Sequence, residues 1–266
     1  MFLQSFLSLK TNEKMIKKSH EFSFYSLSTP MQLQKDQWTQ EDLSGFYAFL
    51  KSIINPTKIS RTQRIINTEL PVLAIPSPKL KEIAKEIAKG NFLSFLELMP
   101  HEIFESTMID AYLIGKIKDF HLQKQYIEKL APLIDNRAVV DSLKFAVKGY
   151  EEVSFSYVQK LIRSEFPFKR RIGIRILFSF VKDENSLEKI FEVLQTLKNE
   201  EHYYVNMASA WLLCECLIFH TQKVLDFLQT GELNDFVVNK TISKARDSSR
   251  ISDDLKEKLG ALKRGK

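Results

Sequence analysis

The sequence predicts an all-α protein, and three observations support that class. Only 8 Gly and 8 Pro occur among 266 residues, which leaves little material for hairpins or long loops. From Glu41 onward, segments with apolar residues at helical spacing follow one another with short breaks at Pro, Gly and Asn. No alternation typical of β-strands intervenes. Such helices stack as antiparallel pairs, so we expect an irregular α-solenoid with a concave face; a compact all-α bundle is the alternative.

The first predicted helix covers 41–53, where Phe46 and Phe49 lie on one face. Pro56 follows its end, and a shorter helix is expected up to about Asn67. Proline lacks the backbone N–H that a helix interior requires, so it marks the boundary between these two helices.

A connector follows at Leu70–Pro78, where three prolines exclude a helix and favour extended backbone. Ser77 is expected as the N-cap and Pro78 as the first residue of a helix over 78–88, which Gly90 closes. Further helices are predicted at 91–98, 101–117, 120–133, 137–148, 154–164, 168–182, 185–199, 202–219, 221–230, 235–249 and 252–263.

The helical domain is predicted to cover 41–266, and residues 1–40 are an N-terminal extension that is either helical or partly disordered. Polar residues interrupt the apolar ones near the start, so no signal peptide is predicted, and no stretch is apolar enough to span a membrane. Cys214 and Cys216 lie on one predicted helix and point roughly 200° apart, so they cannot form a disulfide with each other. We therefore expect a cytoplasmic protein.

The sequence carries no motif for a metal or a cofactor. The stretch HEIFE at 101–105 begins like a zinc-protease motif, but Glu105 stands where its second histidine would be. Glu102 and Glu105 are instead expected in the first turn of a helix, where acids are favourable. There is no phosphate loop, glycine fingerprint or nucleophile elbow, and the five histidines lack ligand spacing. We expect neither a metal nor a cofactor.

The most informative predicted helix is Glu201–Cys216, EHYYVNMASAWLLCEC. Tyr203, Met207 and Trp211 fall at i, i+4 and i+8, so they share one face. Tyr204 lies seven residues before Trp211, and small residues between the rings leave room beside them. An aromatic surface for a ligand and an ordinary buried aromatic cluster both fit this spacing.

The segment Asp135–Asp141, DNRAVVD, combines a helix cap with an expected ion pair. Asp135 or Asn136 can cap the helix that follows. Arg137 and Asp141 then fall at i and i+4, where a surface ion pair contributes about 0.3–0.5 kcal/mol.

The segment Phe168–Arg175, FKRRIGIR, opens a predicted helix with the cations Lys169, Arg170 and Arg171. Cations are unfavourable at a helix N-terminus, and Arg171 and Arg175 are a like-charged i, i+4 pair. The cluster becomes favourable when an anion docks there, because free backbone N–H groups and guanidinium groups then bind the same phosphate. A solvated basic cluster is the alternative.

The net charge of +6 is concentrated near the C-terminus. From Lys240 to Lys266, nine Lys or Arg residues stand against four acids, a surplus of five positive charges in 27 residues. Lys240, Lys244, Arg246 and Arg250 are candidates for contact with an anionic polymer, and a solvated basic tail is the alternative.

Together, these stretches resemble the bacterial DNA alkylation repair family, the AlkD-type DNA glycosylases built from HEAT-like repeats. The resemblance runs from about Phe46 to Arg264, through LAIPSPKLKEIAKEI, FLELMPHEIFE, IDNRAVVDS, RRIGIRIL, YYVNMASAW and NKTISKARDSSRIS. The last two stretches are the more specific ones. The resemblance implies antiparallel HEAT-like helix pairs and a concave basic groove that holds duplex DNA.

The resemblance also implies an activity. Members of the family release cationic N3- and N7-alkylpurines by hydrolysis of the glycosidic bond, without a metal. The family's catalytic aspartate matches Asp141, its phosphate-binding arginine matches Arg171, and one of its two groove tryptophans matches Trp211. A carboxylate stabilises the developing oxocarbenium ion, and an aromatic face holds a cation. The residues expected to bind DNA, with little sequence preference, are Arg137, Lys169, Arg170, Arg171, Arg175, Tyr203, Tyr204, Lys240, Lys244, Arg246 and Arg250.

Two positions depart from the family pattern. Arg137 stands where the family has its second groove tryptophan, so it brings a charge of the same sign as the lesion and can neutralise Asp141. Ala74 replaces a glycine common in the family. Three hypotheses follow: a glycosylase for alkylpurines, a non-catalytic relative that binds damaged or branched DNA, and a helical-repeat scaffold for a protein partner. We expect a monomer that binds no membrane.

Overall fold

The structure is a computed structural model in which residues 31–265 are described. The chain divides into two units, Met1–Gln32 and Leu33–Lys266, and every helix of the described part belongs to the second. This described part contains fourteen α-helices and no β-strand, so the predicted all-α class is confirmed. The expected extension lies for the most part outside the described residues. Within residues 31–265, no helix has both the length and the apolar character needed to cross a membrane.

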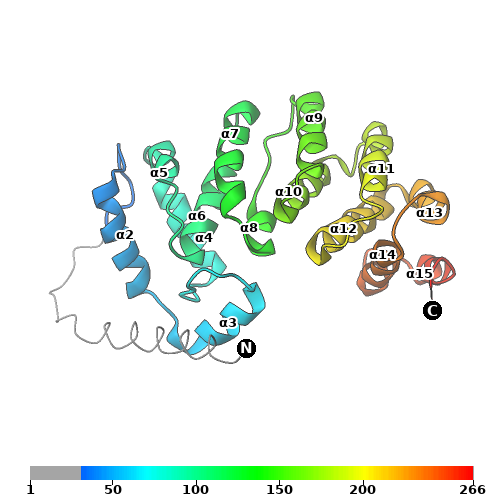
Figure 1. Cartoon of the computed structure of the whole chain (residues 1–266), viewed down its shortest axis with the longest axis horizontal. Helices are drawn as coiled ribbons and strands as arrows, with labels where there is room; N and C mark the ends of the chain where they lie inside the picture. Colours follow the sequence, from blue (N-terminus) through cyan, green and yellow to red (C-terminus); the bar gives the residue numbers. More distant parts are fainter. Residues whose placement is uncertain (1–30, 266) are drawn as a thin grey trace, which may run out of the picture. The chain divides into compact units, whose positions relative to one another are not determined.

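The helices follow one another closely along the chain (Figure 1). They are α2 (Gln40–Ser52), α3 (Ile59–Ile66), α4 (Ser77–Ile87), α5 (Phe92–Leu98), α6 (Phe104–Ile114), α7 (Phe120–Leu130), α8 (Arg137–Ser142), α9 (Glu151–Ile162), α10 (Pro167–Leu177), α11 (Leu187–Thr196), α12 (Tyr203–Phe219), α13 (Thr221–Thr230), α14 (Asp235–Asp247) and α15 (Asp253–Gly260). Short 3-10 turns lie at Pro56–Lys58, Ala131–Leu133, Phe178–Phe180 and Glu184–Ser186.

One row of helices runs through the unit as α4, α6, α8, α10, α12 and α14, and each of these helices packs against the next (Figure 1). Helices α5 and α7 pack against α6, α9 packs against α10, and α11 packs against α9. This arrangement is consistent with the predicted α-solenoid. Side chains on α8, α10 and α12 are therefore close in space although they lie far apart in the sequence.

The core of the described part begins just before α2, at Trp38. Its ring is 1% exposed and meets the rings of Phe46 and Phe95 edge to face, with centroids 5.9 and 4.9 Å away. Its backbone N–H donates to the Ser94 hydroxyl at 2.9 Å. Aromatic pairs in this geometry contribute about 0.5–1.5 kcal/mol beyond the area they bury. Trp38 thereby attaches the start of the unit to α2 and α5.

The helix expected at 137–148 is much shorter in the structure, because α8 ends at Ser142 and extended backbone follows. The buried Gln123 side chain holds that backbone: its amide nitrogen donates to the Lys144 carbonyl and its oxygen accepts the Ala146 N–H, both at 2.9 Å. A long-range partner thus replaces the hydrogen bonds that a longer helix would make. Most other predicted helices agree with the structure within a few residues.

Two smaller expectations at helix starts are wrong. Helix α4 begins at Ser77 itself, with Pro76 in the N-cap position and no side-chain cap. Glu102 lies before α6, which starts at Phe104, so only Glu105 falls in the first turn.

Glu105 holds the connector before α4 in place. Its carboxylate is fully buried and accepts the backbone N–H groups of Leu73 and Ile75 at 3.0 to 3.3 Å. Burial raises the pKa of Glu105, and the N–H groups oppose that rise. Between these two bonded residues, Ala74 adopts a left-handed backbone conformation with φ of 59°.

We predict that Ala74→Gly stabilises the protein. A left-handed conformation costs a residue with a Cβ about 1–2 kcal/mol, and the greater chain entropy of glycine offsets part of the gain. The free energy of unfolding should rise by about 0.5–1 kcal/mol, measured by chemical denaturation. The matched control is Ala48→Gly on the exposed side of α2, which should lower it by about 1 kcal/mol. Equal losses in both variants would contradict this account.

We predict that Asp110→Asn stabilises the protein at neutral pH. Asp110 is completely buried in α6, its oxygens have no hydrogen-bond partner among the described residues, and burial raises its pKa well above the ordinary value. A carboxyl group with a raised folded-state pKa favours the folded state below its unfolded pKa and disfavours it increasingly as pH rises. The melting temperature of the variant should exceed that of the wild type at pH 8, and the difference should shrink toward pH about 4.

The control for this prediction is Asp36→Asn, because Asp36 is exposed. Its melting temperature should follow the wild type at every pH. A pH-independent difference between Asp110→Asn and the wild type would show that the carboxyl group does not titrate between the folded and unfolded states.

Candidate nucleic-acid interface

The position of Asp141 depends on how α8 begins. The Asn136 side chain accepts the Val139 N–H at 3.2 Å, which confirms the predicted cap. The preceding Asp135 carboxylate accepts the Thr68 hydroxyl at 2.7 Å and the Glu69 N–H at 2.6 Å. Asp135 and Asn136, the two residues before α8, are therefore both held by hydrogen bonds. Helix α8 then carries Asp141 toward α10.

Asp141 forms an ion pair with Arg171 of α10. The Nη2 atom of Arg171 lies 2.8 and 2.9 Å from the two carboxylate oxygens, and its Nε atom lies 3.2 Å from Oδ1. Its Nη1 atom donates to the Tyr204 carbonyl of α12. Arg171 is only 3% exposed, so burial lowers its pKa while Asp141 opposes that shift. This guanidinium joins three helices and is largely hidden from solvent.

The prediction that Arg137 pairs with Asp141 is wrong. Arg137 is exposed, and no ion pair between the two forms in the structure. Asp141 instead faces Arg171 and lies 3.7 Å from the Nε atom of Arg175. A buried guanidinium without an acidic partner destabilises the fold more than an exposed one does. Asp141 therefore pairs with the buried Arg171 of α10 and not with the exposed Arg137.

Arg175 and Trp211 form the second part of the site. The Arg175 guanidinium lies 4.3 Å from the Phe178 ring centroid and 4.7 Å from that of Trp211. The Trp211 ring meets Phe178 edge to face, and its Nε1 atom donates to Glu215 at 3.2 Å. Trp211 is nevertheless partly exposed, so its orientation is fixed while part of its surface stays open.

A cavity of about 580 Å³ brings most of the sequence-predicted residues together. We call it the aromatic cavity; it is lined by Ile65, Arg137, Asp141, Arg171, Tyr203, Tyr204, Met207, Trp211 and Lys244. Tyr203, one of the lining residues, is 54% exposed, and its ring packs on those of Tyr204 and Phe236. The alternative of a fully buried aromatic cluster on α12 is therefore wrong.

The remaining sequence-predicted cations do not line the aromatic cavity. Arg170 binds Glu200 through Nη2 at 2.9 Å and also donates to the Ser164 and Glu165 carbonyls. Lys169 lies 3.7 Å from Glu128.

On the C-terminal side, Arg250 pairs with Glu215 at 2.6 Å. Lys240 lies over the Phe236 ring and, with Arg246, lines a separate cavity on α14. The cluster at the start of α10 is thus largely occupied by internal partners, whereas Lys244 is the tail residue that reaches the aromatic cavity.

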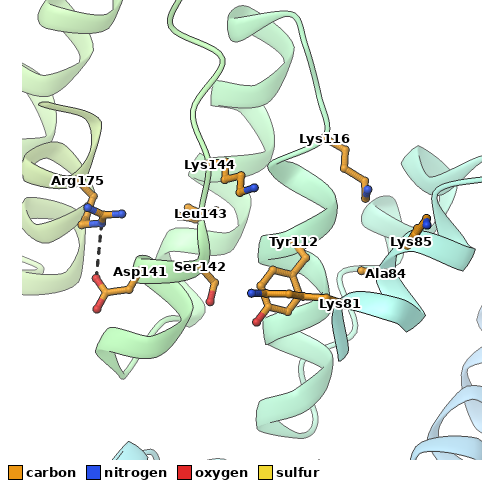
Figure 2. A pocket seen from close by; sticks show the side chains of 10 residues that line it. All are labelled: Lys81, Ala84, Lys85, Tyr112, Lys116, Asp141, Ser142, Leu143, Lys144 and Arg175. Atoms are coloured by element: carbon orange, nitrogen blue, oxygen red, sulfur yellow. Dashed lines mark ion pairs between the residues drawn. The ribbon is translucent and has the colours of Figure 1, made fainter. Parts of the chain in front are cut away.

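A second cavity, of about 480 Å³, lies on the other side of Asp141 and was not expected from the sequence (Figure 2). We call it the lysine cavity; it is lined by Lys81, Ala84, Lys85, Tyr112, Lys116, Asp141, Ser142, Leu143, Lys144 and Arg175. Its lysines come from three separate segments, so no single stretch shows the cluster. The like-charged i, i+4 pair Lys81 and Lys85 is the one local signal that could have indicated it.

The chemistry available in these cavities comes from carboxylate, guanidinium, ammonium and aromatic groups. Within residues 31–265, no three His, Cys, Asp or Glu side chains gather as a metal site would require. Cys214 and Cys216 are both buried and unbonded, and burial raises the pKa of Cys216 to about 12. Neither thiol has the low pKa that a nucleophile needs.

Comparison with known protein families identifies one match. The model of the family described as "DNA alkylation repair enzyme" matches residues 47–250, which include both cavities. No curated protein matches the chain significantly.

We predict that Arg171 stabilises the fold. Arg171→Ala would leave Asp141 without its main partner and the Tyr204 carbonyl without its donor. Breaking a buried pair costs about 3–5 kcal/mol, and because the Asp141 side chain is 22% exposed we expect a loss of about 2–4 kcal/mol in unfolding free energy. The exposed Arg137→Ala is the control and should change stability by less than about 0.5 kcal/mol. Similar small losses in both variants would mean that Arg171 is free to bind an external anion.

Proposed function

The chain belongs to the DNA alkylation repair enzyme family, and on this basis we propose that it binds duplex DNA and releases cationic N3- or N7-alkylpurines by hydrolysis. The observation that carries the proposal is the position of Asp141. Its carboxylate is held by a buried arginine at the wall shared by two cavities, one aromatic and one rich in lysine. A carboxylate held in a defined orientation between an aromatic surface and a cationic one suits a substrate that carries both a cationic base and anionic phosphates.

We propose that the row from α4 to α14 consists of antiparallel HEAT-like helix pairs and that its inner face is a concave basic groove for the duplex. Lys244 and Arg137 in the aromatic cavity would contact phosphates beside Asp141. Such contacts carry little sequence information, so binding would depend on charge and not on base sequence. In this proposal the protein acts as a monomer in the cytoplasm.

The proposed reaction breaks the bond between C1′ of the deoxyribose and the ring nitrogen of the purine. The alkylated purine is already cationic, so it leaves as a neutral base and takes the bonding electrons with it. The sugar becomes an oxocarbenium ion, which the Asp141 carboxylate stabilises. Water then adds to C1′ and its proton passes to Asp141 or to solvent, which leaves an abasic site.

Aromatic residues would hold the lesion beside Asp141. Trp211 is fixed by Phe178 and Glu215, and the Arg175 guanidinium lies over its ring, so a cationic base would contact the part of the ring that stays exposed. Tyr203 and Tyr204 extend the aromatic surface along the same cavity. Contacts to the deoxyribose would not require the base to leave the stack, whereas base flipping is the usual route of glycosylases.

A second candidate is a relative that binds DNA without releasing bases, and the charges around Asp141 favour it. Asp141 is shared by Arg171 and Arg175, and Arg137 and Lys244 line the same cavity. These cations oppose a positively charged base unless DNA phosphates offset them. The two candidates share the binding step and differ in the chemistry.

Release of N7-methylguanine from a methylated duplex tests the proposal. We expect slow release by the wild type, and we expect Arg137→Trp to accelerate it. The change removes a like charge and adds an aromatic face; a desolvated cation–π contact contributes up to about 2 kcal/mol, and each 1.4 kcal/mol expressed in the transition state is about tenfold in rate. A gain on the order of tenfold is therefore expected in single-turnover assays.

Two controls separate the causes. Arg137→Gln removes the charge without adding a ring, so it should give only part of the gain. Adding Asp141→Asn to Arg137→Trp should abolish the gain, and retained binding of unmodified duplex would show that the double variant is folded. Binding without release in every variant would support the second candidate, and a brisk wild type that Arg137→Trp does not accelerate would refute the role given to Arg137.

A further inference from the structure

The lysine cavity gathers four lysines that have no acidic partner in the described part of the chain. Among residues 31–265, none of its lysines forms an ion pair. By contrast, Lys79 of α4 pairs with Glu82, and Lys89, just after α4, pairs with Glu86. Lys81 and Lys85 thus face this cavity without an acidic partner in the described part of the chain, while Lys79 and Lys89 on either side of them are neutralised.

The fold brings these charges together against their mutual repulsion. Lys81 and Lys85 lie one turn apart on α4, a spacing at which like charges destabilise a helix. Lys116 follows α6, and Lys81 lies 5.7 Å from the Tyr112 ring centroid on that helix. Lys144 comes from the extended segment after α8.

Two features hold Lys144 beside α6, the buried Gln123 and Gly115. The Gln123 amide binds its carbonyl, as described above, and also donates to the Ile114 carbonyl at 3.0 Å, which ties the segment to the end of α6. Gly115 permits the close approach, because a Cβ there would lie 3.2 Å from the Lys144 Cβ and 3.3 Å from its backbone nitrogen. The position of Lys144 next to Gly115 is therefore set by the packing of the fold.

The wall shared with the aromatic cavity adds positive charge. Among the described residues, Asp141 is the one acid that lines the lysine cavity, and its carboxylate is already paired with Arg171. Arg175 also lines the cavity, and its Nε atom lies 3.7 Å from the Asp141 carboxylate, an ion pair drawn in Figure 2. Four lysines and Arg175 therefore stand against one carboxylate, and the cavity has a net positive charge.

We propose that the lysine cavity is a phosphate-binding site, and that in the bound complex it holds phosphates of the DNA strand whose modified base occupies the aromatic cavity. The choice of DNA as the source of the phosphates rests on the proposed function; the choice of phosphate rests on the charge of the cavity. One phosphodiester carries a single negative charge, so four unpaired lysines are better matched by two adjacent backbone phosphates or by a dianionic terminal phosphate.

The test compares two triple variants with the same change in net charge. Lys85→Gln/Lys116→Gln/Lys144→Gln alters the cavity, and Lys81 is retained because it packs on Tyr112. The control is Lys160→Gln/Lys189→Gln/Lys198→Gln, which removes surface lysines that pair with Glu128, Glu152 and Glu232. Surface pairs of this kind contribute little to stability, so both proteins should fold.

The first measurement is the affinity for an unmodified duplex without terminal phosphates, over a range of salt concentrations. Each lost phosphate contact lowers the slope of log affinity against log salt by about 1, so the cavity variant should lose about 2 if both phosphates are released and bind at least about tenfold more weakly. The control variant should keep the wild-type slope. The second measurement is calorimetric titration with pyrophosphate, which contains no DNA.

The outcomes separate this inference from the proposed function. A reduced slope in the cavity variant alone supports backbone phosphates as the ligand. Pyrophosphate binding that the cavity variant alone loses, with an unchanged DNA slope, supports the site with a free or terminal phosphate as its source. If the wild type binds duplex and the cavity variant matches it in both measurements, the inference is refuted while the proposed function stands. If the wild type does not bind duplex, the proposed function fails, and the pyrophosphate titration still decides the site.

Discussion

The ion pair between Arg171 and Asp141 is the interaction on which the candidate site depends. A guanidinium that is 3% exposed requires an acidic partner, and Asp141 provides it from a neighbouring helix while the Tyr204 carbonyl takes a further N–H. This requirement sets the relative positions of α8, α10 and α12. It also decides which side of Asp141 remains open. The carboxylate therefore has a structural role whether or not it has a catalytic one.

The two cavities that meet at Asp141 differ in their main ligand-binding groups. The aromatic cavity offers ring faces from α12, and the lysine cavity offers ammonium groups from α4, α6 and the segment after α8. Arg175 lies between them, over the Trp211 ring on one side and along the lysine cavity on the other. Binding in either cavity would change the electrostatic field in the other, because a phosphate near Arg175 would offset part of the positive charge beside Asp141. The proposed base release and the proposed phosphate site are physically coupled in this way.

The sequence anticipated the local features of the site better than its pairings. The Asn136 cap and the helix that carries Trp211 were predicted correctly, because capping and helical periodicity depend on residues close in sequence. The expected partner of Asp141 was wrong, since a local i, i+4 contact with Arg137 competes with a buried cation thirty residues away. The helix predicted after Asn136 was too long for a similar reason. Gln123, on another helix, binds the backbone of Lys144 and Ala146 and holds it extended.

By itself the sequence determined the all-α class and the order of the helices, which follow from apolar periodicity and turn residues. It also indicated the family, through the resemblance of several short stretches. Only the tertiary structure decided which charges are neutralised and which remain free. Arg170 and Arg171 lie near the start of one helix, where the sequence predicts a basic cluster for an external anion. In the structure, both form ion pairs with acids from other parts of the chain. Lys85, Lys116 and Lys144 have no common motif, yet they line one cavity. Whether a charge is paired depends on its distance from others and on its burial, and both are set by the packing of segments far apart in the chain.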